Sequence, residues 1–122
     1  MQNLKNRCKR FAIETGVLIQ QLPKSIINTA YSNQLIRSSS SPGTNYRAAC
    51  RGKSTADFIN KLKIVEEELD ESIYFLELVQ YFNPGFEVQI TKLIKESNEL
   101  LAMTVASIKT VRLNSRKSHL VP

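Results

Sequence analysis

The side chains best suited to chemistry are scarce in this chain, and their spacing matches no catalytic or metal-binding pattern. Cys8 and Cys50 lie far apart in the sequence, and the one histidine, His119, falls among the last four residues. Zinc sites need closely spaced cysteine and histidine ligands, and general acid–base catalysis most often uses histidine. We therefore expect two reduced thiols, and we expect no metal site, no cofactor and no enzymatic activity.

Two carboxylates, Glu68 and Glu71, share one face of any helix that carries them. Di-iron bundles combine such glutamates with Glu-x-x-His repeats, and no histidine stands near this pair. An antiparallel turn near Lys53 instead places Arg37 and Glu71 at the same height, each about 25 Å from the turn at ~1.5 Å per residue. We predict a structural ion pair of Arg37 with Glu68 and Glu71, which requires a helix that continues through Pro42.

Four segments with apolar residues at steps of three and four predict the helices that position these groups. They run from about Gln2 to Gln21, Pro23 to Gly52, Thr55 to Phe82 and Phe86 to Leu113. The short links between them favour an all-α, antiparallel, up-down-up-down four-helix bundle. The 122 residues suffice for one domain, so we expect residues 1–113 to form the bundle and residues 114–122 a flexible basic tail.

The second segment leaves two alternatives open at its SSSSPG stretch, residues 38–43. A proline inside a helix removes one hydrogen bond and bends the axis. The segment therefore forms either two short helices or one long helix kinked near Pro42. We assign Ser38, Ser41 and Asn45 to close packing and to backbone groups that Pro42 leaves without a partner, with ligand binding as the alternative.

The chain carries a net charge of +6 and has a pI near 9.5, which favours acidic partners such as nucleic acid. In an up-down bundle, the start of the first helix and the ends of the second and fourth meet at one end, the basic pole. Its cations are Lys5, Arg7, Lys9, Arg10, Arg47, Arg51, Lys53, Lys109, Arg112, Arg116 and Lys117. Such a pole would bind polyanions through counterion release. Solubility and the helix dipole explain part of it, but the cations at the start of the first helix oppose that dipole.

Two further patterns bear on partners. No stretch approaches the ~18 apolar residues of a membrane span, and no apolar run follows the basic start, so we expect a cytoplasmic protein that does not enter membranes. The fourth segment carries two adjacent apolar stripes, which contain Ile90 and Leu93 in one and Ile94 and Leu101 in the other. A helix apolar on two flanks lies centrally in a bundle or supplies a subunit interface.

Two runs of residues carry a family resemblance: QLIRSSSSPGTNYRAACRGKSTADFINKL at 34–62 and IVEEELDESIYFLELV at 64–79. They resemble the four-helix-bundle proteins encoded in intervening sequences of 23S ribosomal RNA genes. The matching positions are Gln34, Leu35, Arg37, Ser38, Ser41, Asn45, Lys61, Leu62, Glu68, Glu71, Ser72, Phe75 and Leu76. Ser72 replaces a common Thr and Phe75 a common Trp, and both replacements are conservative.

The resemblance implies a four-helix bundle that assembles into ring-shaped homo-oligomers, most familiarly pentamers, without enzymatic activity. It also implies an association with ribosomal RNA or the ribosome. Our first hypothesis is therefore a non-enzymatic oligomeric bundle that binds RNA through the basic pole, with DNA left open as the nucleic acid. The alternative is a structural or adaptor protein that binds another protein through apolar helix faces and has no nucleic-acid role.

Overall fold

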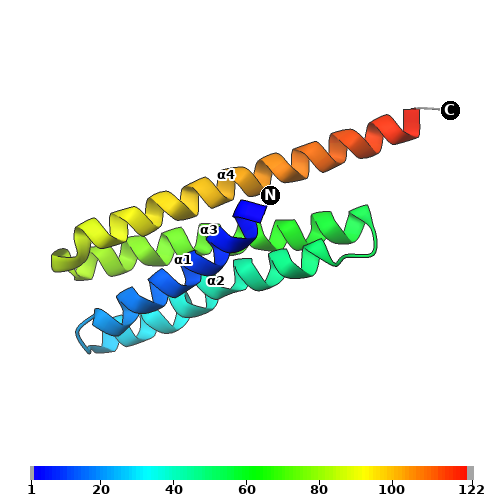
Figure 1. Ribbon diagram of the computed structural model, residues 1–122. Helices are drawn as coiled ribbons and strands as arrows, with labels where there is room; N and C mark the ends of the chain where they lie inside the picture. The colour runs from blue at the N-terminus through cyan, green and yellow to red at the C-terminus, as the bar shows by residue number, and fades with distance from the viewer. Residues whose placement is uncertain (1, 121–122) are drawn as a thin grey trace.

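The computed structural model describes the backbone of residues 2–120 and the side chains of residues 4–116. Four α-helices and one short 3-10 turn account for almost all of the described chain, and no strand occurs in it. The elements are α1 (Gln2–Gln21), α2 (Ile26–Cys50), α3 (Thr55–Phe82), η1 (Pro84–Phe86) and α4 (Glu87–Leu120). The all-α four-helix fold is confirmed (Figure 1).

Pairs of side-chain contacts give the relative direction of neighbouring helices. Asn28 meets Asn83 and Ser38 meets Ser72, so positions that rise along α2 fall along α3. In the same way, Gln80 of α3 bonds Thr91 of α4, while Ser97 of α4 reaches back to the carbonyl of Leu69. Successive helices are therefore antiparallel, as the ribbon shows (Figure 1).

Local signals in the sequence set the helix ends. Ser25 caps α2 by accepting a hydrogen bond from the Asn28 amide at 2.9 Å, so this helix begins at Ile26 and not at Pro23. Ser54 caps α3 in the same way, accepting from the Asp57 amide at 3.1 Å. These serines satisfy backbone donors that the first turn of a helix leaves free.

Helix α2 continues through Pro42 without interruption, so the alternative of two short helices is wrong. Pro42 is buried, and polar side chains bond the carbonyls around it. Asn45 donates from Nδ2 to the Ser41 carbonyl at 3.0 Å and to Ser41 Oγ at 2.8 Å. Thr44 Oγ1 lies 3.5 Å from the Ser40 carbonyl.

Helix α4 extends past its predicted end at Leu113 to Leu120, so the segment that we predicted as a tail begins as helix. The boundary at residue 113 and the flexibility of the tail stay predictions, and residues 121–122 lie outside the described residues. With 34 residues against 20 in α1, helix α4 projects beyond the start of α1 at one end of the bundle (Figure 1).

Leucines at the seam positions of all four helices form the core, together with Phe11, Val65 and Ile90. Small hydroxyl residues interrupt this core, and they are Thr15, Ser38, Ser39, Ser72, Ser97, Thr104 and Ser107. Ser72 Oγ donates to Ser38 Oγ at 3.1 Å, and Ser97 Oγ donates to the Leu69 carbonyl at 3.0 Å. These bonds connect α2 to α3 and α3 to α4, so they define the heights at which the helices pack.

Candidate nucleic-acid interface

The cations of the predicted basic pole occupy two separate surfaces. Gly43 of α2 lies against Cys8 of α1, with 3.8 Å between the Cys8 Cβ and an ideal Cβ position on Gly43, so the start of α1 lies beside the end of α2. Arg7, however, contacts Glu96 and Met103 in the middle of α4. At ~1.5 Å per residue, α1 is about 30 Å long and α4 about 51 Å. The last turns of α4 therefore lie well beyond the first turns of α1.

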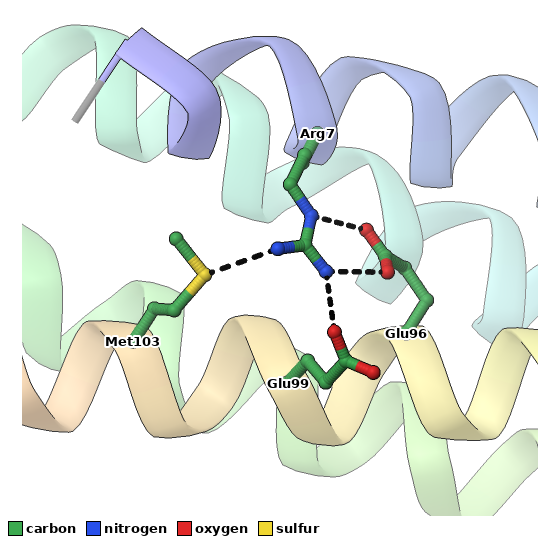
Figure 2. A network of polar contacts seen from close by, with 4 residues as sticks. All are labelled: Arg7, Glu96, Glu99 and Met103. Carbon is green, nitrogen blue, oxygen red and sulfur yellow. Dashed lines mark hydrogen bonds and ion pairs between the residues drawn. The ribbon is translucent and has the colours of Figure 1, made fainter.

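Arg7 does not belong to either free surface, because two carboxylates of α4 neutralise it. Its Nε donates to Glu96 Oε2 at 2.9 Å and its Nη2 to Glu96 Oε1 at 2.6 Å. The same Nη2 reaches Glu99 Oε1 at 2.8 Å, and Nη1 points at the sulfur of Met103, 3.4 Å away (Figure 2). The hydrogen bond with Glu96, followed by that with Glu99, raises the pKa of the guanidinium. The geometry makes Arg7 a link between α1 and α4, which corrects its assignment to the basic pole.

The first free surface is a groove between α1 and α2 with a volume of about 380 Å³. It is lined by Lys5, Asn6, Cys8, Lys9, Ala12, Ser40, Gly43, Thr44 and Arg47, and we call it the α1–α2 groove. Lys5, Lys9 and Arg47 are exposed, and no acidic residue lines the groove. No carboxylate among the lining residues therefore offsets the positive charge of the groove.

The inner wall of the groove is chemically inert at neutral pH. Cys8 is fully buried, and burial raises the pKa of its thiol to about 11, so the sulfur stays protonated. Beneath it, burial and then a hydrogen bond with Cys50 raise the pKa of Tyr46 to about 12. The predicted reduced thiols are present as free cysteines, Cys8 buried and Cys50 exposed.

The second free surface lies around the α2–α3 turn and the end of α4. Lys53 and Val111 line the same shallow hollow, so the turn stands level with that part of α4. The exposed cations of this surface, which we call the distal surface, are Arg51, Lys53, Lys109, Arg112 and Arg116. Arg10 is also exposed on α1, and the side chain of Lys117 lies outside the described residues.

The predicted ion pair of Arg37 with Glu68 and Glu71 does not form. Among the described side chains, the ion pairs within 4.0 Å are those of Arg7. Arg37 and Glu71 are exposed, although the Ser38–Ser72 contact shows that their heights were predicted correctly. Adjacent helical residues point about 100° apart. Because Ser38 faces α3, Arg37 turns away from it.

Although no ion pair forms, the charge of Arg37 still acts weakly on the carboxyl group of Glu68. Burial and the nearby Glu71 raise the pKa of Glu68, and the charge of Arg37 lowers it only in part. The other polar residues of the same motif lie on α2 and differ in exposure. Ser38 Oγ donates to the Leu35 carbonyl at 3.3 Å, and Gln34 is exposed.

Two features escaped the sequence analysis. The first is a chain of ring contacts across α2 and α3, in which centroids lie 5.1–6.2 Å apart. Its members, the aromatic face, are Tyr31, Tyr74, Phe75, Tyr81 and Phe82. Tyr74 and Tyr81 are 57% and 79% exposed, so the face is largely open to solvent. Their spacing of two helical turns on α3 was a visible signal.

The second missed feature is a reciprocal amide pair. Asn28 Nδ2 donates to Asn83 Oδ1 at 2.9 Å, and Asn83 Nδ2 donates to Asn28 Oδ1 at 2.8 Å. Both residues are buried, and no local pattern in the sequence announces such a pair.

The described residues also bear on metal binding and on membrane insertion. They contain no group of three or more His, Cys, Asp or Glu side chains arranged to hold a metal ion. None of the helices in this part of the chain combines the length and apolar character needed to cross a membrane.

Comparisons with known proteins agree with the fold and the motifs. A family model described as 23S rRNA-intervening sequence protein matches residues 2–106. A similar solved structure is that of a protein of unknown function from the S23 ribosomal protein family of Bacteroides thetaiotaomicron. It is 30% identical, has a TM-score of 0.78, and the similarity covers 87% of this chain and 98% of that one. No curated protein matches.

Proposed function

This chain belongs to the 23S rRNA-intervening sequence protein family, and from that premise we propose that it is a non-enzymatic cytoplasmic protein that binds RNA, ribosomal or ribosome-associated. The observation that carries the proposal is the separation of charge over the bundle. Six of the eleven acids lie between Glu66 and Glu77 of α3, whereas the α1–α2 groove has no acidic lining residue. A polyanion would meet positive potential at one side of the molecule and repulsion at another.

The physical mechanism is the release of counterions from phosphates. Each neutralised phosphate contributes about 0.7 to the slope of log affinity against log salt for single strands, and about 0.9 for duplex DNA. Binding of this kind needs no base-specific contact and no catalytic group. It predicts an affinity that depends on salt and changes little with RNA sequence.

The test is a filter-binding titration of the full chain with a 23S ribosomal RNA fragment and with duplex DNA at rising salt. Removing two distal cations, in the variant Arg112→Gln/Arg116→Gln, should lower affinity for all RNA sequences alike. The matched control, Lys61→Gln/Lys63→Gln, removes the same charge from two exposed positions on the acidic helix α3 and should have little effect. Weak binding without a salt slope would refute the proposal.

The aromatic face favours a second candidate function, which is contact with another protein. We propose that a second copy of this chain covers it, as a homo-oligomer would require; the resemblance favours a pentamer. Phe82 is 43% exposed and, together with the exposed rings of Tyr74 and Tyr81, forms an apolar surface that faces solvent. Large contiguous apolar patches on a protein surface mark interaction sites.

Sedimentation of the wild type and of a Tyr81→Glu variant tests the second candidate. The variant should dissociate assemblies that Leu113→Glu, a control at a 52% exposed position on α4, leaves intact. If the wild type is monomeric, the aromatic face serves another protein or none, and the adaptor alternative replaces self-association.

A further inference from the structure

The α1–α2 groove brings three cations from two helices around one hollow. Lys5 and Lys9 stand one turn apart on α1, and Arg47 stands across from them on α2. Gly43 packs closely against Cys8 beneath the groove, since an ideal Cβ placed on Gly43 would lie 3.8 Å from the Cys8 Cβ, so the two helices are in contact there. The cations are therefore held on rigid helices and not on loops.

The cations of α1 divide between two tasks. Arg7 turns to α4, where Glu96 and Glu99 neutralise it. Lys5 and Lys9 turn to the groove, where none of the lining residues is acidic. The positive end of the helix dipole repels Lys5 in the first turn of α1, and no lining carboxylate offsets the mutual repulsion of Lys5, Lys9 and Arg47. An anionic ligand would offset that repulsion.

The polar groups at the groove suit phosphate oxygens. The guanidinium of Arg47 can bond two phosphate oxygens at once, and the lysines add mobile point charges. Ser40, Thr44 and Asn6 add neutral donors along the rim. The bond of Thr44 Oγ1 to the Ser40 carbonyl is long, at 3.5 Å, so this hydroxyl can turn to a ligand at small cost.

We propose that the α1–α2 groove is a phosphate-binding site, and that it seats the backbone phosphates of bound RNA. The inference rests on the proposed function, which it makes specific: the groove, and not the distal surface, is the principal contact. All residues of the groove fall within the range that matches the family model, residues 2–106, whereas three of the five distal cations, Lys109, Arg112 and Arg116, fall outside it. A free nucleotide offers the same phosphate chemistry, so the test includes one.

The test measures binding of the full chain to a fluorescent single-stranded RNA by anisotropy, and to uridine monophosphate by calorimetry. Lys9→Gln/Arg47→Gln removes two groove cations, and Arg112→Gln/Arg116→Gln removes two distal ones as the matched control. The groove variant should bind RNA roughly tenfold more weakly near physiological salt and lower the salt slope by about 1.4. The distal variant should show a smaller loss. Thr44→Glu keeps every cation, adds a carboxylate at an exposed rim position and should weaken RNA binding as well.

Lysine acetylation in the presence and absence of RNA provides a second readout that does not depend on variants. Bound RNA should protect Lys5 and Lys9 and leave Lys61 reactive. Thermal melting of each variant checks that the fold persists. We expect it to persist because the substituted positions are exposed on helix surfaces.

The outcomes separate the groove from the proposed function. If the distal variant loses RNA binding and the groove variants retain it, the groove proposal is wrong and RNA binding stands. If uridine monophosphate binds the groove while RNA does not bind at all, the phosphate site stands and the proposed function fails. If polyglutamate displaces RNA as well as phosphate polymers do, and the nucleotide does not bind, the groove recognises negative charge in general and the phosphate proposal is overturned.

Discussion

The buried amide pair Asn28–Asn83 should stabilise the fold through two shared hydrogen bonds. The side chains exchange bonds of 2.9 and 2.8 Å, and both residues are almost fully buried, 6% and 5% exposed. Each amide also bonds a carbonyl: Asn28 that of Pro23, and Asn83 that of Val79, both at 2.8 Å. The pair therefore joins the α1–α2 link, the start of α2 and the end of α3.

The loss of unfolding free energy on removing one partner follows from these hydrogen bonds. Asn28→Ala deletes three hydrogen bonds, worth about 1 kcal/mol each, and leaves Asn83 Oδ1 buried without a donor, at a further cost of roughly 1 kcal/mol. We expect a loss of about 2–4 kcal/mol, which for a chain of this size lowers the melting temperature by roughly 8–16 °C. Asn83→Ala should cost a similar amount for the same reason.

A double-mutant cycle isolates the shared bonds. Both single variants lose the same two bonds, and each leaves the partner amide without its bond, a cost that the double variant avoids. Asn28→Ala/Asn83→Ala should therefore be less destabilised than the sum of the singles by about 2–4 kcal/mol. Urea unfolding monitored by circular dichroism supplies the four free energies. The exposed pair Gln80–Thr91, bonded at 2.9 Å, is the control, and its coupling should be well below ~1 kcal/mol. Additive losses at Asn28 and Asn83 would refute the reasoning that the two amides stabilise the fold through shared hydrogen bonds.

Three further predictions concern single groups. Arg7→Gln should lower the melting temperature by about 4 °C, or ~1 kcal/mol, and leave RNA affinity within about twofold in filter binding, because the guanidinium is already neutralised. A disulfide reagent should label Cys50 at once and Cys8 only on unfolding. Burial raises the pKa of the Cys8 thiol from 9.0 to about 11, so its contribution to the unfolding free energy is complete below pH 9 and is lost as the pH rises to 11. The variant Cys8→Ala should not show this loss of stability at high pH. Arg37→Gln should leave the melting temperature within about 2 °C, because Arg37 is exposed and forms no ion pair. Glu68→Gln should raise the melting temperature at neutral pH, because burial and a neighbouring carboxylate raise the pKa of Glu68 and so disfavour its charged form. A clear drop in either melting temperature would contradict this.

Helix positions were predictable because they depend on local signals. The apolar period locates α1 and α3, and the Ser54 cap and the Asn83–Pro84 stop mark both ends of α3. The end of α4 was missed for a physical reason: Leu113, Asn114 and Arg116 are exposed, so the apolar pattern disappears although the helix continues. Apolar residues recur with the helical period only where one face of a helix is buried, and a projecting helix buries little of its surface.

Heights along the bundle were predictable, whereas directions around each helix were not. The rise per residue placed Arg37 level with Glu71, as the Ser38–Ser72 contact shows. The ion pair still fails, because one residue of offset turns a side chain by about 100°. Arg7 illustrates the same limit, since its partner Glu96 lies far along the chain and only the packing of α1 on α4 brings them together.

Because the helices differ in length, the cations of the proposed RNA contact are divided between two surfaces. A bundle of four equal helices would gather all its cations at one tip, where mutual repulsion would destabilise the fold and a ligand would have one point of contact. Here the groove lies beside Gly43 and the distal surface beside Val111, and Arg47 and Arg51, one helical turn apart, connect the two sets, whose mutual repulsion salt screens. An RNA long enough to reach both would bind the second set at a high effective concentration once the first is occupied. Two modest basic surfaces on rigid helices can therefore bind a polyanion more tightly than the charge of either surface alone would allow.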